Sequence, residues 1–287
     1  MKKSKRDYEA EITNKVIAQL EAGVAPWHKS WVGGISLALR ENGQPYRGYN
    51  QFILSMSGYA SPYWFTYKKA SELGGQVRKG EKGTAIHFFK PIDIKDKATG
   101  EDKKIPLMKF YSVFNAEQID GLPERFFPKP VERTPVERDA RAEQYIKNCG
   151  ADIRHGGGKA FYSPSTDFIQ LPDVDAFEDY TAYAGTAIHE LAHWTGHKTR
   201  LARDLRNDFG GKDYAREELI AEASSALICA HLNLEPEPRP DHASYLQSWL
   251  DVLKEDKSAL RKAFAKAQKV VDFLDGLQQL ATEKKVA

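Results

Sequence analysis

The stretch His189-Glu190-Leu191-Ala192-His193 decides how the fold and chemistry of this chain are interpreted. It has the pattern HExxH and stands in a segment whose apolar residues recur at helical spacing. Residues four apart on an α-helix lie on the same face, so the two imidazoles are expected side by side. A tetrahedral zinc site requires this arrangement, with a carboxylate beside the first histidine. The pattern predicts one divalent metal, with zinc ahead of manganese, and a metal-dependent hydrolase.

A third metal ligand has to come from elsewhere in the chain, because a catalytic zinc site uses about three protein ligands. Gly196 continues one metalloprotease pattern, HExxHxxG, but that pattern needs a histidine at position 199, where this chain has Thr199. His197 stands two residues too early, just after the predicted end of the helix. We therefore interpret His197 as a residue that contacts a ligand or the substrate, and not as the third ligand.

The next helical stretch offers two acids on one face. Glu218 and Glu222 are four residues apart, within the segment 216–222. This spacing resembles the glutamate-zincin pattern, in which the ligand glutamate comes first and an acid follows one turn later. The resemblance favours Glu218 as the metal ligand and Glu222 as the acid that orients a histidine. The reverse assignment of the two acids stays open.

The catalytic roles follow from the predicted metal. Glu190 is the expected general base, because it lies beside the first histidine and faces the same cavity. Tyr183, His197 and Tyr214 are candidate donors to an oxyanion, and the sequence does not rank them. The strand at 167–171 is expected to offer a free edge to an extended peptide. Two other interpretations stay open: HExxH occurs by chance in exposed helices, and a bound metal can be purely structural.

Composition and charge limit the class of protein. The chain has 287 residues, 41% of them hydrophobic, enough for one large domain or two of ordinary size. The net charge is +6 over residues 1–125 and −4 over 126–287, which predicts a polyanionic partner for the front half. Two cysteines, Cys149 and Cys229, form no disulfide framework and fit a reducing compartment. Neither a signal peptide nor a membrane span is expected, so the protein is predicted to be cytoplasmic, with no membrane partner.

An α+β fold is predicted, divided by a proline-rich segment. Residues 123–135 hold four prolines and are expected to form an extended, semi-rigid linker between domains at 1–122 and 136–287. Helices are expected at 7–21, 49–56, 67–73, 136–148, 180–195, 214–232 and 243–280. A hairpin is expected over 76–90, a mobile loop over 93–104, a strand over 107–114 and two strands around a turn over 161–171.

Aromatic and basic residues alternate in the front half, as in Tyr63-Trp64-Phe65-Thr66-Tyr67-Lys68-Lys69. Bases of single-stranded DNA stack on aromatic faces, and Lys and Arg follow the phosphates. The candidate DNA contacts are Tyr46, Arg47, Tyr49, Asn50, Trp64, Tyr67, Lys68, Lys69, Arg78, Lys79 and Lys82. No base-reading motif is visible, so strong sequence specificity is not expected. The open alternative is that most of these rings fill the core of a small domain.

Together these motifs resemble a known family. The front-half stretches 46–50, 61–67 and 74–83 are similar to the N-terminal domain of ArdC-type antirestriction proteins. The rear-half stretches 189–197 and 214–222 are similar to the zincin-like metallopeptidase domain of that family. The resemblance covers nearly the whole chain. The family's N-terminal domain also occurs in plasmid-transferred primases, and this sequence shows no primase segment.

The resemblance implies a small basic α+β domain that binds single-stranded DNA, followed by a zincin-like metallopeptidase domain, in a plasmid-encoded protein. It implies protection of entering DNA from host restriction during conjugation. It does not identify the protein substrate, for which one hypothesis is a restriction component brought near by shared DNA. The alternative is a DNA-shielding protein whose metal is structural. A third hypothesis, action of the metal on nucleic acid, is disfavoured because two-metal nucleases use clustered carboxylates.

Overall fold

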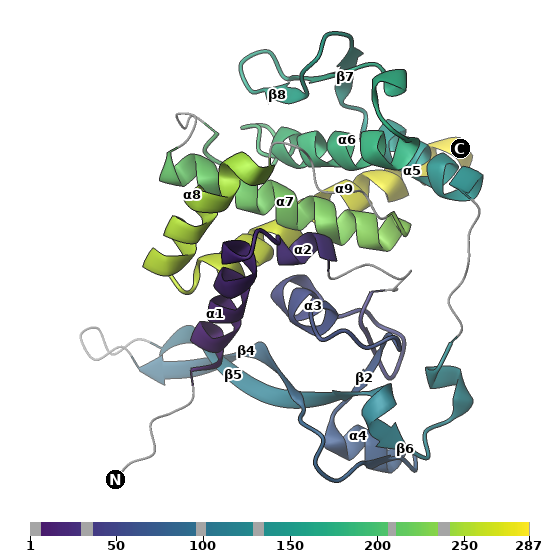
Figure 1. Cartoon of the computed structure of the whole chain (residues 1–287), viewed down its shortest axis with the longest axis vertical. Coiled ribbons are helices and arrows are strands. Elements are labelled where there is room, and N and C mark those ends of the chain that lie inside the picture. Colours follow the sequence, from purple (N-terminus) through teal and green to yellow (C-terminus); the bar gives the residue numbers. More distant parts are fainter. Residues whose placement is uncertain are drawn as a thin grey trace.

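The computed structural model describes residues 7–29, 37–95, 102–128, 135–205, 211–234 and 242–286. Figure 1 shows a twisted sheet from the front half at one end, helices from both halves in the middle and a small sheet from the rear half at the other end. Strands and helices are largely separated in space, and the predicted α+β class is confirmed. None of the helices in this described part is both long and apolar enough to cross a bilayer.

The front half is built on a four-stranded sheet with the order β1-β2-β5-β4. Its strands are β1 (Leu39–Arg40), β2 (Tyr63–Phe65), β4 (Thr84–Lys95) and β5 (Asp102–Asn115). β1 and β2 are parallel, and the other neighbours are antiparallel. The charged segment predicted as a loop over 93–104 extends both long strands instead, and its residues 96–101 lie outside the described residues.

The hairpin predicted over 76–90 is wrong. β3 (Gln76–Val77) pairs with β6 (Ile119–Asp120) in a separate two-stranded sheet, while β4 pairs with β5. The connection between β3 and β4 is held by Gln118, whose Nε2 donates to the Lys82 carbonyl at 3.1 Å and to Glu81 Oε2 at 2.9 Å. These contacts lead the chain from the small sheet into the large sheet. The turn-like residues 79–83 therefore connect two sheets and do not form a hairpin.

Three of the front helices begin within one residue of the predicted positions, and a fourth is not predicted. α1 (Tyr8–Glu21) is capped by the carboxylate of Asp7, which accepts from the Ala10 N–H at 3.0 Å. α4 (Tyr67–Glu72) is capped by Thr66, whose hydroxyl accepts from the Lys69 N–H at 3.2 Å. The other two helices are α3 (Gly48–Ser55), which is predicted, and α2 (Pro26–Lys29), which is not. Two short 3-10 turns follow the sheet, at Ala116–Gln118 and Glu124–Phe126.

The rear half begins with α5 (Pro135–Cys149) and a three-stranded sheet with the order β7-β9-β8. Its strands are β7 (Asp152–His155), β8 (Phe161–Ser163) and β9 (Phe168–Leu171), with β8 and β9 forming the predicted antiparallel pair. The free edge expected over 167–171 is wrong, because β9 is central and paired on both sides. β7 and β8 are the two edge strands of this sheet among the described residues.

Four helices complete the rear half after a 3-10 turn at Val174–Ala176. They are α6 (Tyr180–Trp194), α7 (Lys212–Leu232), α8 (His242–Glu255) and α9 (Ala259–Val286). The single helix predicted over 243–280 is wrong. The Asp256 carboxylate accepts from the Ser258 N–H at 2.9 Å, and this local turn separates α8 from α9.

One hydrophobic core joins the two halves. Phe52 of α3 stacks on Phe264 of α9 with ring centroids 4.4 Å apart, and Trp27 of α2 meets the edge of Trp249 of α8 at 5.1 Å. All four side chains are fully buried. The domain break at 123–135 stays a prediction, and its residues 129–134 lie outside the described residues. The front helices α2 and α3 therefore pack directly on the rear helices α8 and α9.

Candidate metal centre

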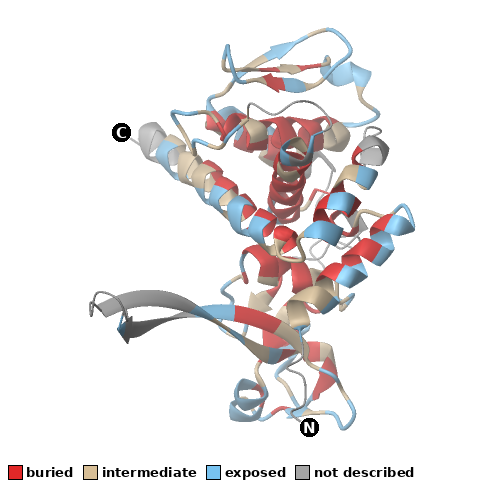
Figure 2. Cartoon of the chain, turned by 90° about the vertical axis from the view of Figure 1, so that its left-hand side faces the viewer, coloured by how far each residue is buried: buried red, intermediate tan, exposed pale blue. Residues whose placement is uncertain are grey.

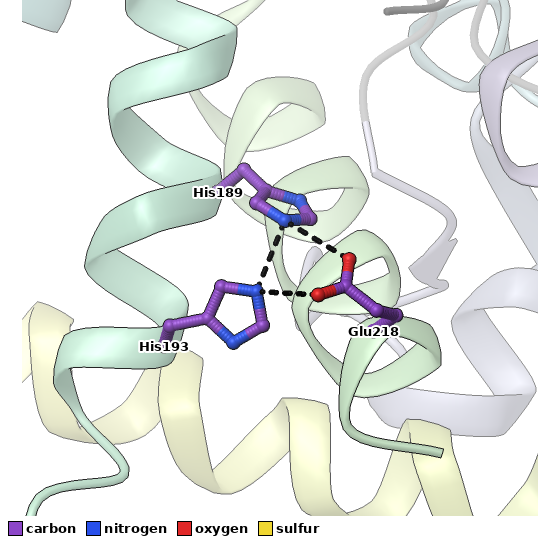
Figure 3. Close-up of side chains that lie close together, drawn as sticks. All are labelled: His189, His193 and Glu218. Atoms are coloured by element: carbon purple, nitrogen blue, oxygen red, sulfur yellow. Dashed lines mark hydrogen bonds and ion pairs between the residues drawn. The ribbon is translucent and has the colours of Figure 1, made fainter. Parts of the chain in front are cut away.

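Two packed helices bring the predicted ligands together. α6 carries His189 and His193 one turn apart, and α7 carries Glu218 opposite them. The two histidine Nε2 atoms lie 3.1 Å apart; the Glu218 oxygens lie 3.5 Å from that of His189 and 3.3 Å from that of His193. Figure 3 shows the three side chains pointing at one another. Two imidazole nitrogens and a carboxylate thus converge on one point, where their donor atoms all lie within 4.8 Å of one another.

A further acid stands behind each histidine. Glu222 Oε1 lies 3.2 Å from Nδ1 of His189, and Glu217 Oε1 lies 3.3 Å from Nδ1 of His193. At His193 this contact is a hydrogen bond between Nδ1 and the Glu217 carboxylate, and at His189 it is an ion-pair distance to Glu222. An acid at Nδ1 leaves Nε2 as the ring nitrogen that faces the shared point. Such a contact is predicted for Glu222. Glu217 is not predicted, because the spacing of four residues selects only Glu218 and Glu222. The sequence signal for it is that His193, like His189, needs an acid at its Nδ1 atom.

Arg203 holds Glu217 in place. Its Nη2 donates to Glu217 Oε1 at 2.8 Å, and its Nε donates to Oε2 at 3.1 Å. The same guanidinium donates to the Ala192 carbonyl at 2.6 Å and to the Thr195 hydroxyl at 2.9 Å. This fork of charge-assisted hydrogen bonds ties the end of α6 to α7 and fixes the orientation of His193 through Glu217.

The acids keep the cluster ionised. Burial lowers the pKa of His193, but the charge of Glu218 and the hydrogen bonds that the ring donates to Glu217 and Glu218 outweigh it and raise the pKa to about 10. Burial by itself raises the pKa of Glu218, but the two histidines lower it below its usual range. Burial also raises the pKa of Glu217, but its contacts with His193 and Arg203 lower that pKa below its usual value. The buried carboxylates therefore hold a proton on His193, and a metal ion that binds here has to displace that proton.

The convergent side chains open into a cavity of about 260 Å³. Glu190 lies on its wall and is 4% exposed, so a carboxylate faces the same space as the histidines. The edge strand β8 contributes Phe161 and Tyr162 to another wall, and Leu205 closes the space on the side of the segment after α6. The cavity therefore combines titratable groups with an apolar wall and a strand edge.

Two tyrosines supply hydroxyl groups to the cavity. Tyr214 of α7 and Tyr245 of α8 both line it, with their oxygens 3.3 Å apart. Burial and the charge of Glu218 raise the pKa of Tyr214 well above its usual range, so its hydroxyl keeps its proton and stays a donor. Tyr214 is a predicted candidate, whereas Tyr245 is missed because only the packing of α8 on α7 brings it there.

Tyr183 and His197 are not among the residues that line the cavity. The Tyr183 hydroxyl lies 3.0 Å from Nε2 of His155, near the start of α6. His197 Nδ1 lies 2.8 Å from the Thr199 hydroxyl and 3.9 Å from a carboxylate oxygen of Asp167. Both side chains therefore have local partners away from the convergent histidines.

The front-half candidates divide by burial. Tyr46, Tyr49 and Trp64 are at most 5% exposed and belong to the core. Asn50 pairs with the backbone of His87: its Nδ2 donates to the carbonyl at 2.6 Å and its Oδ1 accepts from the N–H at 3.0 Å. These four side chains do structural work in the layer between sheet and helices. For the three aromatic residues this is the alternative in which the rings fill the core.

The remaining front-half candidates are exposed, and most of their charges face an acid. The partners are Asp272 for Arg47, Glu72 for Lys68 and Lys69, and Glu81 and Asp120 for Arg78. Tyr67 is 52% exposed, and Lys79 and Lys82 are exposed in the turn before β4. An interface built from these residues has to compete with their own ion pairs.

Comparisons with known proteins agree with this architecture. The sequence model described as "N-terminal domain of anti-restriction factor ArdC" matches residues 6–114, and that described as "Zincin-like metallopeptidase" matches residues 140–266. Two crystal structures of the antirestriction ArdC protein from R388 plasmid are similar to this chain. The metal-free one has 43% identity and a TM-score of 0.82, covering 96% of this chain and 98% of that one. The Mn(II)-bound one has 42% identity and a TM-score of 0.80, covering 95% and 98%.

Curated relatives extend the comparison. A protein of Sinorhizobium fredii, named "Uncharacterized protein y4eC", is 40% identical over 98% of this chain and 95% of its own length. A protein of Escherichia coli named "DNA primase TraC" is also 40% identical over 97% of this chain, which spans only 28% of that relative's length. The chain belongs to the ArdC antirestriction family, and a plasmid protein is among its relatives.

Proposed function

We propose that this chain is a plasmid antirestriction protein that binds single-stranded DNA and carries a metal-dependent peptidase site. In this role it protects incoming DNA from host restriction in the recipient cytoplasm during conjugation. The observation that carries the peptidase part is the convergence of His189, His193 and Glu218 beside the buried carboxylate of Glu190. The antirestriction part is supported by membership of the ArdC family.

The three convergent residues fit a divalent metal. A cation held tetrahedrally at about 2.0–2.1 Å needs donor atoms roughly 3.3 Å apart. The two histidine Nε2 atoms lie 3.1 Å apart, His193 lies 3.3 Å from Glu218 Oε1, and His189 lies 3.5 Å from Glu218 Oε2. One donor atom from each residue lies within 4.8 Å of the other two. His189, His193 and Glu218 would therefore hold it, with Glu222 and Glu217 at the outer nitrogens of the two histidines. Zinc suits two nitrogens and one oxygen, and manganese is the second candidate, because the R388 relative is described as Mn(II)-bound.

The chain's own residues supply the acid–base chemistry. When bound, a divalent ion supplies Lewis acidity, which acidifies water and polarises a substrate carbonyl. Glu190 accepts the proton of the attacking water and returns it to the leaving amine. The hydroxyls of Tyr214 and Tyr245 stand where they can donate to a developing oxyanion. An extended peptide would pair with the edge of β8, which lines the same cavity.

A second candidate is a DNA-shielding protein whose metal is structural. The observation that favours it is the small size of the cavity: about 260 Å³ lies below the roughly 300–1,000 Å³ of ordinary ligand pockets. The deep burial of His189 and Glu218, at 2% and 3% exposed, points the same way. In this case the chain would need the metal only to hold α6 against α7.

Plasmid transfer into restricting and non-restricting recipients separates the two candidates. Glu190→Ala removes the proposed base and leaves the three proposed ligands in place. If proteolysis is required, this variant loses protection in the restricting recipient while its binding of single-stranded DNA stays at the wild-type level. If Glu190→Ala protects incoming DNA as well as the wild type does, the peptidase proposal fails and the shielding function stands.

A further inference from the structure

The hairpin of β4 and β5 leaves the body of the molecule as an arm. Figure 2 shows the arm passing from buried residues at its base to exposed residues further out. The two strands are in continuous antiparallel register from Thr84 and Val113 outward. Because side chains alternate between the two faces of a strand, this register assigns each residue of the arm to one face.

One face of the arm packs on the front helices. The ring of His87 lies 5.4 Å from that of Tyr49 on α3, and the ring of Phe110, the partner of His87 across the strands, lies 5.2 Å from that of Tyr8 on α1. Phe89 follows on the same face, further out along β4. This face is therefore turned toward the helical layer.

The opposite face carries Phe88, Lys109, Tyr111 and Leu107, and we call these four residues the outer face. Phe88 pairs with Lys109 across the strands, and its ring meets that of Tyr111 edge-on at 5.5 Å. Phe88 is 40% exposed and Leu107 is 38% exposed. Adjacent apolar side chains that stay exposed on a projecting strand mark a surface for interaction.

Two cations of this region differ from most of the predicted contacts in their partners among the described residues. Lys109 on the outer face and Arg40 at its base are exposed, and neither has an ion pair with any described residue. Arg40 is held by the ring of Tyr46, with its guanidinium carbon 5.0 Å from the ring centroid. The buried Tyr46 ring therefore positions the exposed Arg40 and is not itself accessible to DNA.

We propose that the outer face, together with Arg40, is the base-stacking platform for single-stranded DNA. The inference rests on the proposed DNA-binding function and names its site. Exposed rings accept any base, because every base has an aromatic face, and unneutralised cations attract the phosphates between stacked bases. The platform differs from the predicted contacts, most of which are either buried or paired with acids. Tyr67, Lys79 and Lys82 are the exposed exceptions.

The test compares Phe88→Ala with Phe89→Ala in the full chain. Phe89 is the matched control, because it is the same residue type on the same strand, is 50% exposed and lies on the opposite face. The affinity for a fluorescein-labelled oligothymidylate of about twenty nucleotides is measured by anisotropy at several salt concentrations. We expect Phe88→Ala to weaken binding by about tenfold and Phe89→Ala by less than about twofold. Lys109→Gln should lower the slope of log affinity against log salt by about one.

Each outcome decides one question. Phe88→Leu keeps the apolar contact and removes the ring, so a loss in this variant as well, with an unchanged melting temperature, assigns the effect to stacking. If the wild type binds and Phe88→Ala equals Phe89→Ala, the platform is refuted while DNA binding survives. If the wild type does not bind the oligonucleotide even at low salt, the proposed DNA-binding function fails and the platform fails with it.

Discussion

The metal centre and the front-half surface both gather charged residues, but they hold them in opposite ways. His189 and Glu218 are at most 3% exposed and lie 3.5 Å apart, and a carboxylate oxygen of Glu222 lies 3.2 Å from His189. The side chain of Lys68 is 86% exposed and lies 3.8 Å from its partner. Buried charges depend strongly on their partners, whereas exposed pairs contribute about 0–1 kcal/mol. Single changes should therefore have large effects at the centre and small, graded effects on the surface.

The largest expected effect comes from Glu190→Gln. The amide keeps the shape of the side chain and cannot accept the proton, so hydrolysis of casein by the metal-loaded protein should fall by roughly 10²–10⁴-fold. Metal content, measured by elemental analysis, should stay at the wild-type level. Glu178→Gln, an exposed acid just before α6, serves as the control and should leave the rate unchanged. An undiminished rate in Glu190→Gln would remove Glu190 from the mechanism.

Phe264→Ala should break the connection between the two regions. Its ring is fully buried against Phe52, and truncation of a buried phenylalanine costs about 3–5 kcal/mol of unfolding free energy. Because one core runs through both halves, urea unfolding followed by tryptophan fluorescence and by metal release should give a single coincident transition. Leu280→Ala, at an exposed position of the same helix, should change stability by less than about 0.5 kcal/mol. Two separate transitions would show that the halves fold independently.

The helical spacing explains why so much of the metal centre can be predicted from sequence. On a helix, residues four apart must share a face, so His189 and His193 are fixed relative to each other before any tertiary contact is known. The same spacing selects Glu218 and Glu222. It fails for Glu217, which reaches the site because α7 packs closely on α6, and for Tyr245, which α8 brings from a distant part of the chain.

The front half shows where composition stops being informative. Alternating rings and cations indicate a surface that binds DNA, but they do not say which side chains are exposed. Tyr49 and Trp64 are in the core, and Tyr46 supports Arg40. The pairing of β4 with β5, and not with β3, depends on long-range contacts such as those of Gln118, which no local pattern reveals. Strand register is therefore what divides the exposed rings of the arm, Phe88 and Phe89, between its two faces.

Glu222→Gln sharpens the comparison within the metal centre itself. Its Oε1 lies 3.2 Å from Nδ1 of His189, so removal of its charge weakens the hold on the imidazole without removing a ligand. Loss of an acid that holds a metal-binding histidine costs roughly 10–100-fold in metal affinity. We expect Glu222→Gln to lower the metal affinity by about this factor, measured by competition with a chelator. His189→Ala is the reference variant and should lose more than Glu222→Gln. If the two variants lose equal amounts of metal, Glu222 is itself a ligand and the assignment of Glu218 has to be revised.

The smallest effect is expected for Lys68→Gln and Lys69→Gln on the front surface. Glu72 lies 3.8 Å and 2.8 Å from the two ammonium groups and already neutralises much of their charge. Each change should therefore alter the affinity for single-stranded DNA by less than about twofold. Glu72→Gln is the complementary variant: it releases both lysines and should strengthen binding by about two- to threefold at low salt, with a steeper salt dependence. A loss in Lys68→Gln as large as that in Lys109→Gln would move the DNA path from the arm to α4, because a cation held by an acid would then contact phosphate as effectively as an unneutralised one.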